Sequence, residues 1–285
     1  MTEKDMTKMT ETISENFVSE NSACNISDIF PKYEQIILLD IETTGLSVDE
    51  NQIIELAAIR YCNPKFRDQF GSDFEQETSI DLLVQLPDGI SIPQEIIELT
   101  NISNEMLAEF GISEAEAAAD FLKLFLPAEE NSKTLIIAHN AQFDLSFIFK
   151  MLKNQNLKIP VEFDVLDTFT VFKDRKAYPH SLKDAIEYYQ INDVENTHRA
   201  IDDVKALCEV VKYMKTERDD LDDYINLIGV HRVHGLWGDK IDGVNYCIQM
   251  LGVKRKRLPD FLKEGKRIYD PEKLKETRPL IFKDE

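Results

Sequence analysis

The chain has 285 residues, of which 43% are hydrophobic, so it is long enough for one large domain with extensions or for two modest domains. It has no run of 18 apolar residues and no apolar core of a signal peptide near its polar N-terminus, which predicts a cytoplasmic protein without membrane contact. A formal net charge of −20 argues against tight, unaided binding of long duplex DNA.

Residues 1–32 are rich in Thr, Ser, Glu, Asn and Lys and are predicted to be a mostly disordered tail. Apolar segments predict a first strand over 35–41 and further strands at 53–62, 79–86, 134–138 and 163–166. Helical patterns are expected near 93–108, 113–126, 141–154, 181–190 and 198–215. Strands first, then alternating strands and helices, indicate an α/β fold with a mixed sheet flanked by helices.

Two carboxylates, Asp40 and Glu42, stand at the end of the first predicted strand. Side chains at i and i+2 of a strand point the same way, so these two should project together, and two adjacent like charges favour a bound cation. Thr43, Thr44 and Gly45 follow, with small side chains where a ligand could approach the main chain closely.

A third carboxylate, Asp144, lies just after the strand predicted at 134–138. Asn140 is a candidate N-cap for the helix that follows, which places Asp144 in its first turns. Taken alone, Asp144 could simply favour the positive end of the helix dipole.

A fourth carboxylate, Asp203, lies five residues after His198. Five helical positions rotate the side chain by about 140° net, so the two cannot share one face of a helix. His198 is therefore expected at or before the helix start, with Asp203 inside the helix and Asp202 as its solvated neighbour.

The three segments 40–46 (DIETTGL), 139–144 (HNAQFD) and 198–203 (His-x4-Asp), in this order, resemble the three motifs of the DEDDh group of DnaQ-like 3′-to-5′ exonucleases. The resemblance covers about residues 34–215. Arg199 stands where the sister group carries Tyr, which indicates the His type. The resemblance implies a ribonuclease H-like architecture with a five-stranded sheet.

The resemblance also implies the site. Asp40, Glu42, Asp144 and Asp203 would hold two divalent cations, Mg²⁺ or Mn²⁺, with Asp40 as the candidate to bridge both ions. His198 would accept the proton of the attacking water, a task suited to an ordinary pKa of about 6.5. Carboxylate oxygens suit these hard cations, whereas the four cysteines share no spacing that would suggest zinc.

Substrate contacts follow from the same resemblance. Thr43 and Thr44 would hold the terminal nucleotide, Leu46 would lie against its base and Phe143 beside it, and Asn140 completes the predicted substrate-binding set. Apolar contact with a base face is insensitive to base identity. Phe143 could equally be an ordinary core residue.

The predicted exonuclease domain covers 33–215, and 216–285 form a helical or irregular extension with a short helix over Leu221–Ile228. His231 and His234 lack further spaced ligands for a metal, and Trp237 and Tyr246 are expected to cover apolar surface. Residues 250–285 carry a net charge of +4, densest at 254–257. This tail could contact nucleic acid, or the extension could dock a polymerase or repair protein; a solvated tail is the simpler alternative.

Together these features predict a metal-dependent 3′-to-5′ exonuclease that acts on single-stranded or frayed DNA ends and releases 5′-mononucleotides in proofreading or repair. One alternative is an exoribonuclease that trims RNA ends, because the motifs specify phosphodiester hydrolysis and not the sugar. A second alternative is a non-catalytic polymerase-associated scaffold. The intact carboxylates and His198 argue against it.

Overall fold

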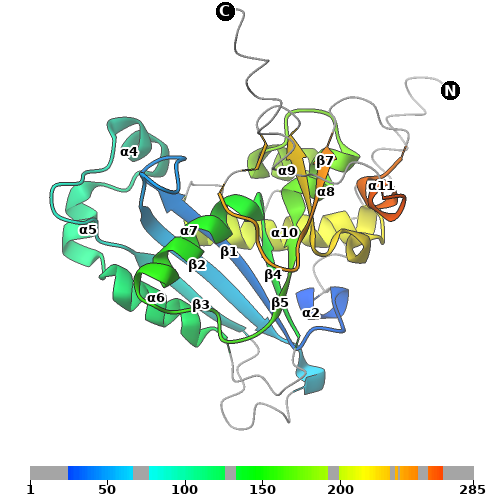
Figure 1. Ribbon diagram of the computed structural model, residues 1–285, viewed down its shortest axis with the longest axis horizontal. Coiled ribbons are helices and arrows are strands. Elements are labelled where there is room, and N and C mark those ends of the chain that lie inside the picture. Colours follow the sequence, from blue (N-terminus) through cyan, green and yellow to red (C-terminus); the bar gives the residue numbers. More distant parts are fainter. Residues whose placement is uncertain are drawn as a thin grey trace, which may run out of the picture.

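The centre of the computed structural model is a five-stranded sheet in the order β3-β2-β1-β4-β5 (Figure 1). The structure describes residues 25–66, 77–125, 133–191, 199–231, 235–236, 238–249 and 256–265. The strands are β1 (Gln35–Thr43), β2 (Ile53–Cys62), β3 (Glu77–Leu83), β4 (Thr134–Ala138) and β5 (Phe163–Asp167). β2 is antiparallel to β1 and β3, and β4 is parallel to β1 and β5. This is the mixed α/β sheet that the sequence predicts.

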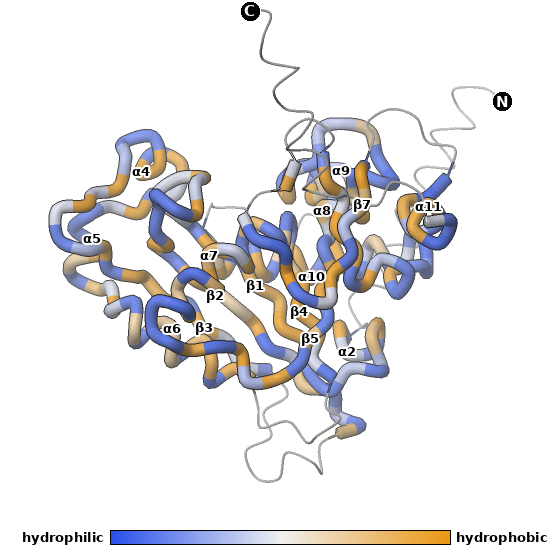
Figure 2. The backbone as a smooth tube through the Cα atoms, viewed as in Figure 1, coloured by the Kyte–Doolittle hydropathy of each residue, from blue (hydrophilic) through white to orange (hydrophobic). Residues whose placement is uncertain are grey.

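The strands send alternate side chains into two hydrophobic cores. Ile36 and Leu38 of β1 face the core that is covered by α10 (Ala200–Glu217). Ile37 and Leu39 face the core covered by α6 (Glu114–Lys123) and α7 (Ala141–Asn154). Figure 1 shows α6 and α7 in front of the sheet and α10 behind it, and Figure 2 shows the hydrophobic character of the central strands. By the same alternation, Asp40 lies on the α10 side.

The other described elements surround this sheet. They are α2 (Ile26–Ile29), η1 (Pro64–Phe66), α4 (Gln94–Thr100), α5 (Asn104–Phe110), α8 (Thr168–Arg175), α9 (Leu182–Tyr189), η3 (Leu221–Tyr224), β6 (Leu227–His231), β7 (Asn245–Gln249) and α11 (Leu258–Lys263). None of the described helices is long and apolar enough to cross a membrane.

Several elements differ from the sequence prediction. Part of the predicted disordered tail is helix α2, because Ile26 and Ile29 are buried in the core beneath α10. The helix predicted over 93–108 is two helices, and Asn101 between them adopts a left-handed conformation with φ 58°. Helix α8 was not predicted. The remainder of the tail, residues 1–24, lies outside the described residues.

The described part of the C-terminal region packs onto the sheet. The helix predicted over Leu221–Ile228 is wrong: a 3₁₀ turn ends at Tyr224 and strand β6 follows, paired in parallel with β7. Asn226 joins this segment to β5, since its N–H donates to the Val165 carbonyl at 2.7 Å and its side-chain oxygen accepts the Val165 N–H at 2.8 Å. Tyr246 is buried, as expected, and donates to Gln142 of α7.

Candidate metal centre

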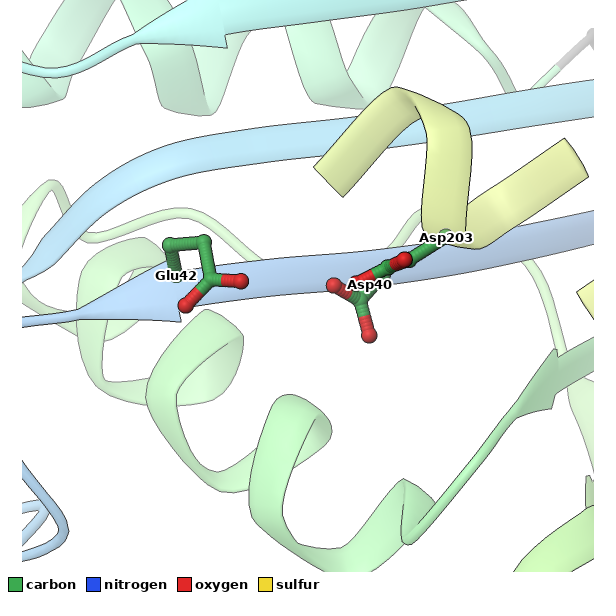
Figure 3. Close-up of side chains that lie close together, drawn as sticks. All are labelled: Asp40, Glu42 and Asp203. Carbon is green, nitrogen blue, oxygen red and sulfur yellow. The ribbon is translucent and has the colours of Figure 1, made fainter. Parts of the chain in front are cut away.

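Three carboxylates meet on the α10 side of the sheet. Asp40 and Glu42 extend from the end of β1, and Asp203 reaches them from the first turn of α10 (Figure 3). One carboxylate oxygen of each lies within 4.8 Å of those of the other two. The i, i+2 spacing on the strand therefore brings Asp40 and Glu42 together as predicted, and the helix supplies the third group.

Asp144 approaches the same strand from the other face. It is the fourth residue of α7, it is only 3% exposed, and it is hydrogen-bonded by the backbone of Ile41, between Asp40 and Glu42. Asp144 is also the neighbouring charge with the largest effect on the pKa of Asp40. The structure thus brings all four predicted carboxylates to the end of β1.

Burial and mutual repulsion both act on the carboxylates of this cluster. Burial, reinforced by the neighbouring acids, raises the pKa of Glu42 to about 8 and that of Asp203 to about 7. Burial likewise raises the pKa values of Asp40 and Asp144 well above the ordinary range. Oδ1 of Asp203 is buried and has no hydrogen-bond partner among the described residues. An all-carboxylate donor set with an unused buried oxygen fits a hard divalent cation.

The start of α7, which positions Asp144, is held by a carboxylate from β5. Asn140 occupies the N-cap position as expected, but its φ is 82° and its side chain makes no capping bond. Oδ1 of Asp167 instead accepts the N–H groups of Asn140 (2.9 Å), Ala141 (3.2 Å) and Phe169 (3.2 Å), while Oδ2 accepts the hydroxyl of Thr170. Asp167 therefore joins the starts of α7 and α8.

Replacing Asp167 by alanine should destabilise the protein by about 3 kcal/mol or more, because each buried donor left unsatisfied costs about 1–3 kcal/mol. Urea denaturation followed by circular dichroism measures this loss. Ser113→Ala is the matched control, because it removes an exposed capping box on α6 and should cost only about 1 kcal/mol. Equal losses for the two variants would contradict this role of Asp167.

His198, the predicted proton acceptor, lies outside the described residues. Helix α10 begins at Ala200 with Arg199 at its N-cap position, so His198 precedes the helix in the chain, as expected. Both Arg199 and Ala200 contact Glu55 of β2, which is fully buried. Glu55 and Asp167 are not among the residues predicted from the sequence. A charged residue inside the apolar run 53–62 was the available signal for Glu55, since buried carboxylates are rare without a partner.

The predicted substrate-binding residues surround the end of β1. Thr43 and Thr44 are buried, and their hydroxyls are engaged in the loop that follows, with the Gly45 carbonyl and the Gln52 N–H. Leu46 is 66% exposed, which leaves an apolar side chain free for a ligand. A Cβ on Gly45 would lie 2.8 Å from the side-chain oxygen of Asn51, which accepts the N–H of Ser47, so a larger residue would have to displace that side chain.

The two other members of this set belong to the start of α7. Asn140 is exposed. Phe143 is partly buried and packs on Phe147 with ring centroids 5.0 Å apart, so it contributes to the core on the α7 side.

Most of the described sheet and its helices lie in a region that is similar in sequence to known proteins. The sequence profile of a family described as "Exonuclease" matches residues 37–211. A "DNA polymerase III PolC-type" from Clostridium perfringens is 31% identical over 195 residues, which are 65% of this chain and 12% of that protein. A "3'-5' exonuclease DinG" from Staphylococcus haemolyticus is 30% identical over 195 residues, 65% of this chain and 19% of that protein. The chain thus corresponds to a small part of these relatives.

Solved structures give the same fold. Escherichia coli exonuclease I in complex with a dA16 oligonucleotide matches with a TM-score of 0.55 and 19% identity, over 67% of this chain and 42% of that chain. Cell-death related nuclease 4 matches with a TM-score of 0.52 and 15% identity, over 65% of each chain. The ribonuclease H-like architecture predicted from the sequence is confirmed.

Proposed function

The chain belongs to the Exonuclease family, whose profile covers more than half of its length, and from this premise we propose that it is a metal-dependent 3′-to-5′ exonuclease acting on single-stranded or frayed DNA ends. The observation that carries the proposal is the meeting of Asp40, Glu42, Asp144 and Asp203 at the end of β1. Four carboxylates gathered at one point are unfavourable without a counter-charge, and a divalent cation supplies it.

These carboxylates would hold two divalent cations, Mg²⁺ or Mn²⁺. When bound, the cations would activate a water molecule and offset negative charge on the phosphate and on the departing 3′ oxygen. The role of the protein is to present the carboxylate oxygens together, from a strand and two helices whose starts are fixed by buried contacts. His198, two residues before the first residue of α10 in the chain, would accept the proton of the attacking water.

The DNA end would lie over the loop after β1. The exposed Leu46 supports this, because an apolar side chain beside the carboxylates can contact a terminal base of any identity. Thr43 and Thr44 would contact the same nucleotide through their backbone. The preference for DNA rests on the relatives, which are named as a DNA polymerase and a 3′-to-5′ exonuclease.

The experiment that tests this function compares single-stranded DNA and RNA oligonucleotides of one sequence, with Mg²⁺, Mn²⁺ or EDTA. We expect metal-dependent release of 5′-mononucleotides, faster from DNA than from RNA. Faster degradation of RNA than of DNA would favour the alternative that the protein is an exoribonuclease that trims RNA ends. Failure to cleave either substrate, with folded protein and saturating metal, would contradict the nuclease assignment.

We also propose that residues 216–285 mediate contact with a polymerase or repair protein. The relatives named PolC-type polymerases support this, since the region similar to this chain is there part of a polymerase chain. In the basic segment, Arg257 is engaged by Asp220 and Asp260, whereas residues 254–255 and 266–285 lie outside the described residues. Removing 266–285 and measuring co-migration with a purified polymerase tests the contact. Unchanged co-migration would show that residues 266–285 are not needed for the contact.

A further inference from the structure

Glu55 is a charged side chain in strand β2 that solvent does not reach. Both of its oxygens are used at the start of α10. Oε1 accepts a hydrogen bond from Nε of Arg199 at 2.7 Å and pairs with Nη2 of the same guanidinium. Oε2 accepts the backbone N–H of Ala200 at 2.8 Å. Glu55 therefore caps α10 from the sheet, because Arg199 at the N-cap position makes no side-chain capping bond itself.

This contact lies beside the carboxylate cluster. Glu55 is paired with Glu42 across β1 and β2. Asp203 lies in the same first turn of α10 as Ala200, whose N–H Glu55 binds. The negative charge of Glu55 also contributes to the raised pKa values of Asp40, Glu42 and Asp203, as expected for a close neighbour. Glu55, which binds the start of α10, thus lies next to the carboxylates that Asp203 of α10 approaches.

The chemistry of Glu55 and Arg199 suits them to fix the start of α10 relative to the sheet. An ordinary N-cap side chain belongs to the segment it caps, so it cannot fix that segment relative to a sheet. A carboxylate on β2 can fix the helix relative to the sheet, because it accepts hydrogen bonds both from a backbone N–H of the helix and from an arginine guanidinium, and two such contacts define a direction. Arg199 also compensates the charge of Glu55, which would otherwise add a fifth unpaired carboxylate to the cluster.

On the basis of the proposed nuclease function, we propose that Glu55 and Arg199 are positioning residues that set the first turn of α10 against β1. They hold Asp203 at Asp40 and Glu42. Neither is assigned a contact with the substrate. Their effect is on the geometry of the groups that act on it, and misplacement of such groups by about 1 Å costs about 100-fold in rate.

The test is the steady-state kinetics of Glu55→Gln on a single-stranded DNA oligonucleotide. The substitution keeps the size of the side chain but removes the charge that binds Arg199. We expect kcat to fall about 10- to 100-fold, with KM for the oligonucleotide little changed, because Glu55 is buried away from the substrate. The half-saturating Mg²⁺ concentration should rise, since Asp203 is less well held and the positive charge of Arg199 is no longer paired with the negative charge of Glu55.

The matched control is Asp220→Asn, at the other end of the same helix. Asp220 binds Arg175 there in a second buried pair, with side-chain exposures of 9% and 2%. An 18-residue helix is about 27 Å long, so this pair is far from the carboxylates. We expect Asp220→Asn to lower the melting temperature and leave kcat and the Mg²⁺ dependence unchanged. All assays are run below the melting temperature of each variant.

Arg199→Lys is the second variant, on a side chain that is one-third exposed. It keeps the positive charge and loses the fork, so its loss of kcat should be smaller than that of Glu55→Gln, and it remains informative if the latter fails to fold. A folded Glu55→Gln variant with the kcat and Mg²⁺ dependence of the wild type would overturn the proposal. If Glu55→Gln does not fold, the same result in folded Arg199→Lys would overturn it. A loss of kcat in Asp220→Asn equal to that in Glu55→Gln would also overturn it. An inactive wild type would instead refute the nuclease function itself.

Discussion

Replacing Asp203 by asparagine is expected to lower kcat about 1000-fold while it raises the melting temperature of the metal-free protein. A bound cation contributes several kcal/mol of charge stabilisation, and each 1.4 kcal/mol corresponds to about tenfold in rate. The gain in stability follows because the ionised Asp203, with its pKa raised to about 7, is unfavourable in the folded chain. Burial is the main cause, and an uncharged amide of nearly the same shape avoids its cost; it also removes the negative charge that raises the pKa values of Asp40 and Glu42.

Asp202→Asn is the control for this variant. Asp202 is the adjacent acid on α10 and forms an ion pair with Lys205, at 3.2 Å, within the same helix. Exposed pairs of this type contribute about 0.5 kcal/mol or less, so activity and melting temperature should stay close to those of the wild type. A similar loss of kcat in both variants, or full activity in Asp203→Asn, would remove Asp203 from the metal site.

The affinity for Mg²⁺ is expected to fall steeply as the pH decreases from 8 to 6. A carboxylate must lose its proton to bind a cation, and burial raises the pKa of Glu42 to about 8 and that of Asp203 to about 7. Below pH 7 both groups are largely protonated, so each lost ligand site weakens binding by up to about tenfold per pH unit. Activity titrated with Mg²⁺ at pH 6, 7 and 8 measures the effect.

The stability of the metal-free protein should increase as the pH falls, whereas the affinity for Mg²⁺ decreases. The folded pKa values of these acids are raised above the unfolded values of about 4, so the folded state binds more protons than the unfolded state between about pH 4 and pH 8. The free energy of unfolding in EDTA therefore decreases as the pH rises through this window. Saturating Mg²⁺ should raise the melting temperature more at pH 8 than at pH 6. An equal shift at both pH values would contradict the coupling.

The central part of the fold follows from local sequence patterns. The runs 35–41 and 134–138 are apolar at nearly every position, as expected of strands covered on both faces, and both are strands. The spacing of Asp40 and Glu42 predicted their common direction because a strand has a period of two. Asp203 could be placed in a helix because the apolar stripe that follows it has helical spacing.

The contacts that fix these elements against one another could not be read from the same patterns. Asp167 caps a helix that begins 26 residues earlier, and Glu55 caps one that begins 145 residues later. Such partners are determined by the order of strands in the sheet, which local periodicity does not specify. The helix expected over 221–228 failed for a related reason: Asn226 is bound to the edge strand β5, and this tertiary contact overrides local helical spacing.

The measurement that tests the central claim most directly is the product pattern from 5′-labelled single-stranded DNA, with wild type and Asp40→Asn, in Mg²⁺ and in EDTA. We predict that the wild type produces a ladder shortened one nucleotide at a time from the 3′ end in Mg²⁺. Neither wild type in EDTA nor folded Asp40→Asn in Mg²⁺ should produce it. Immediate release of the labelled 5′ nucleotide, cleavage that persists in EDTA, or an unchanged ladder with Asp40→Asn would contradict a metal-dependent 3′-to-5′ exonuclease at this site.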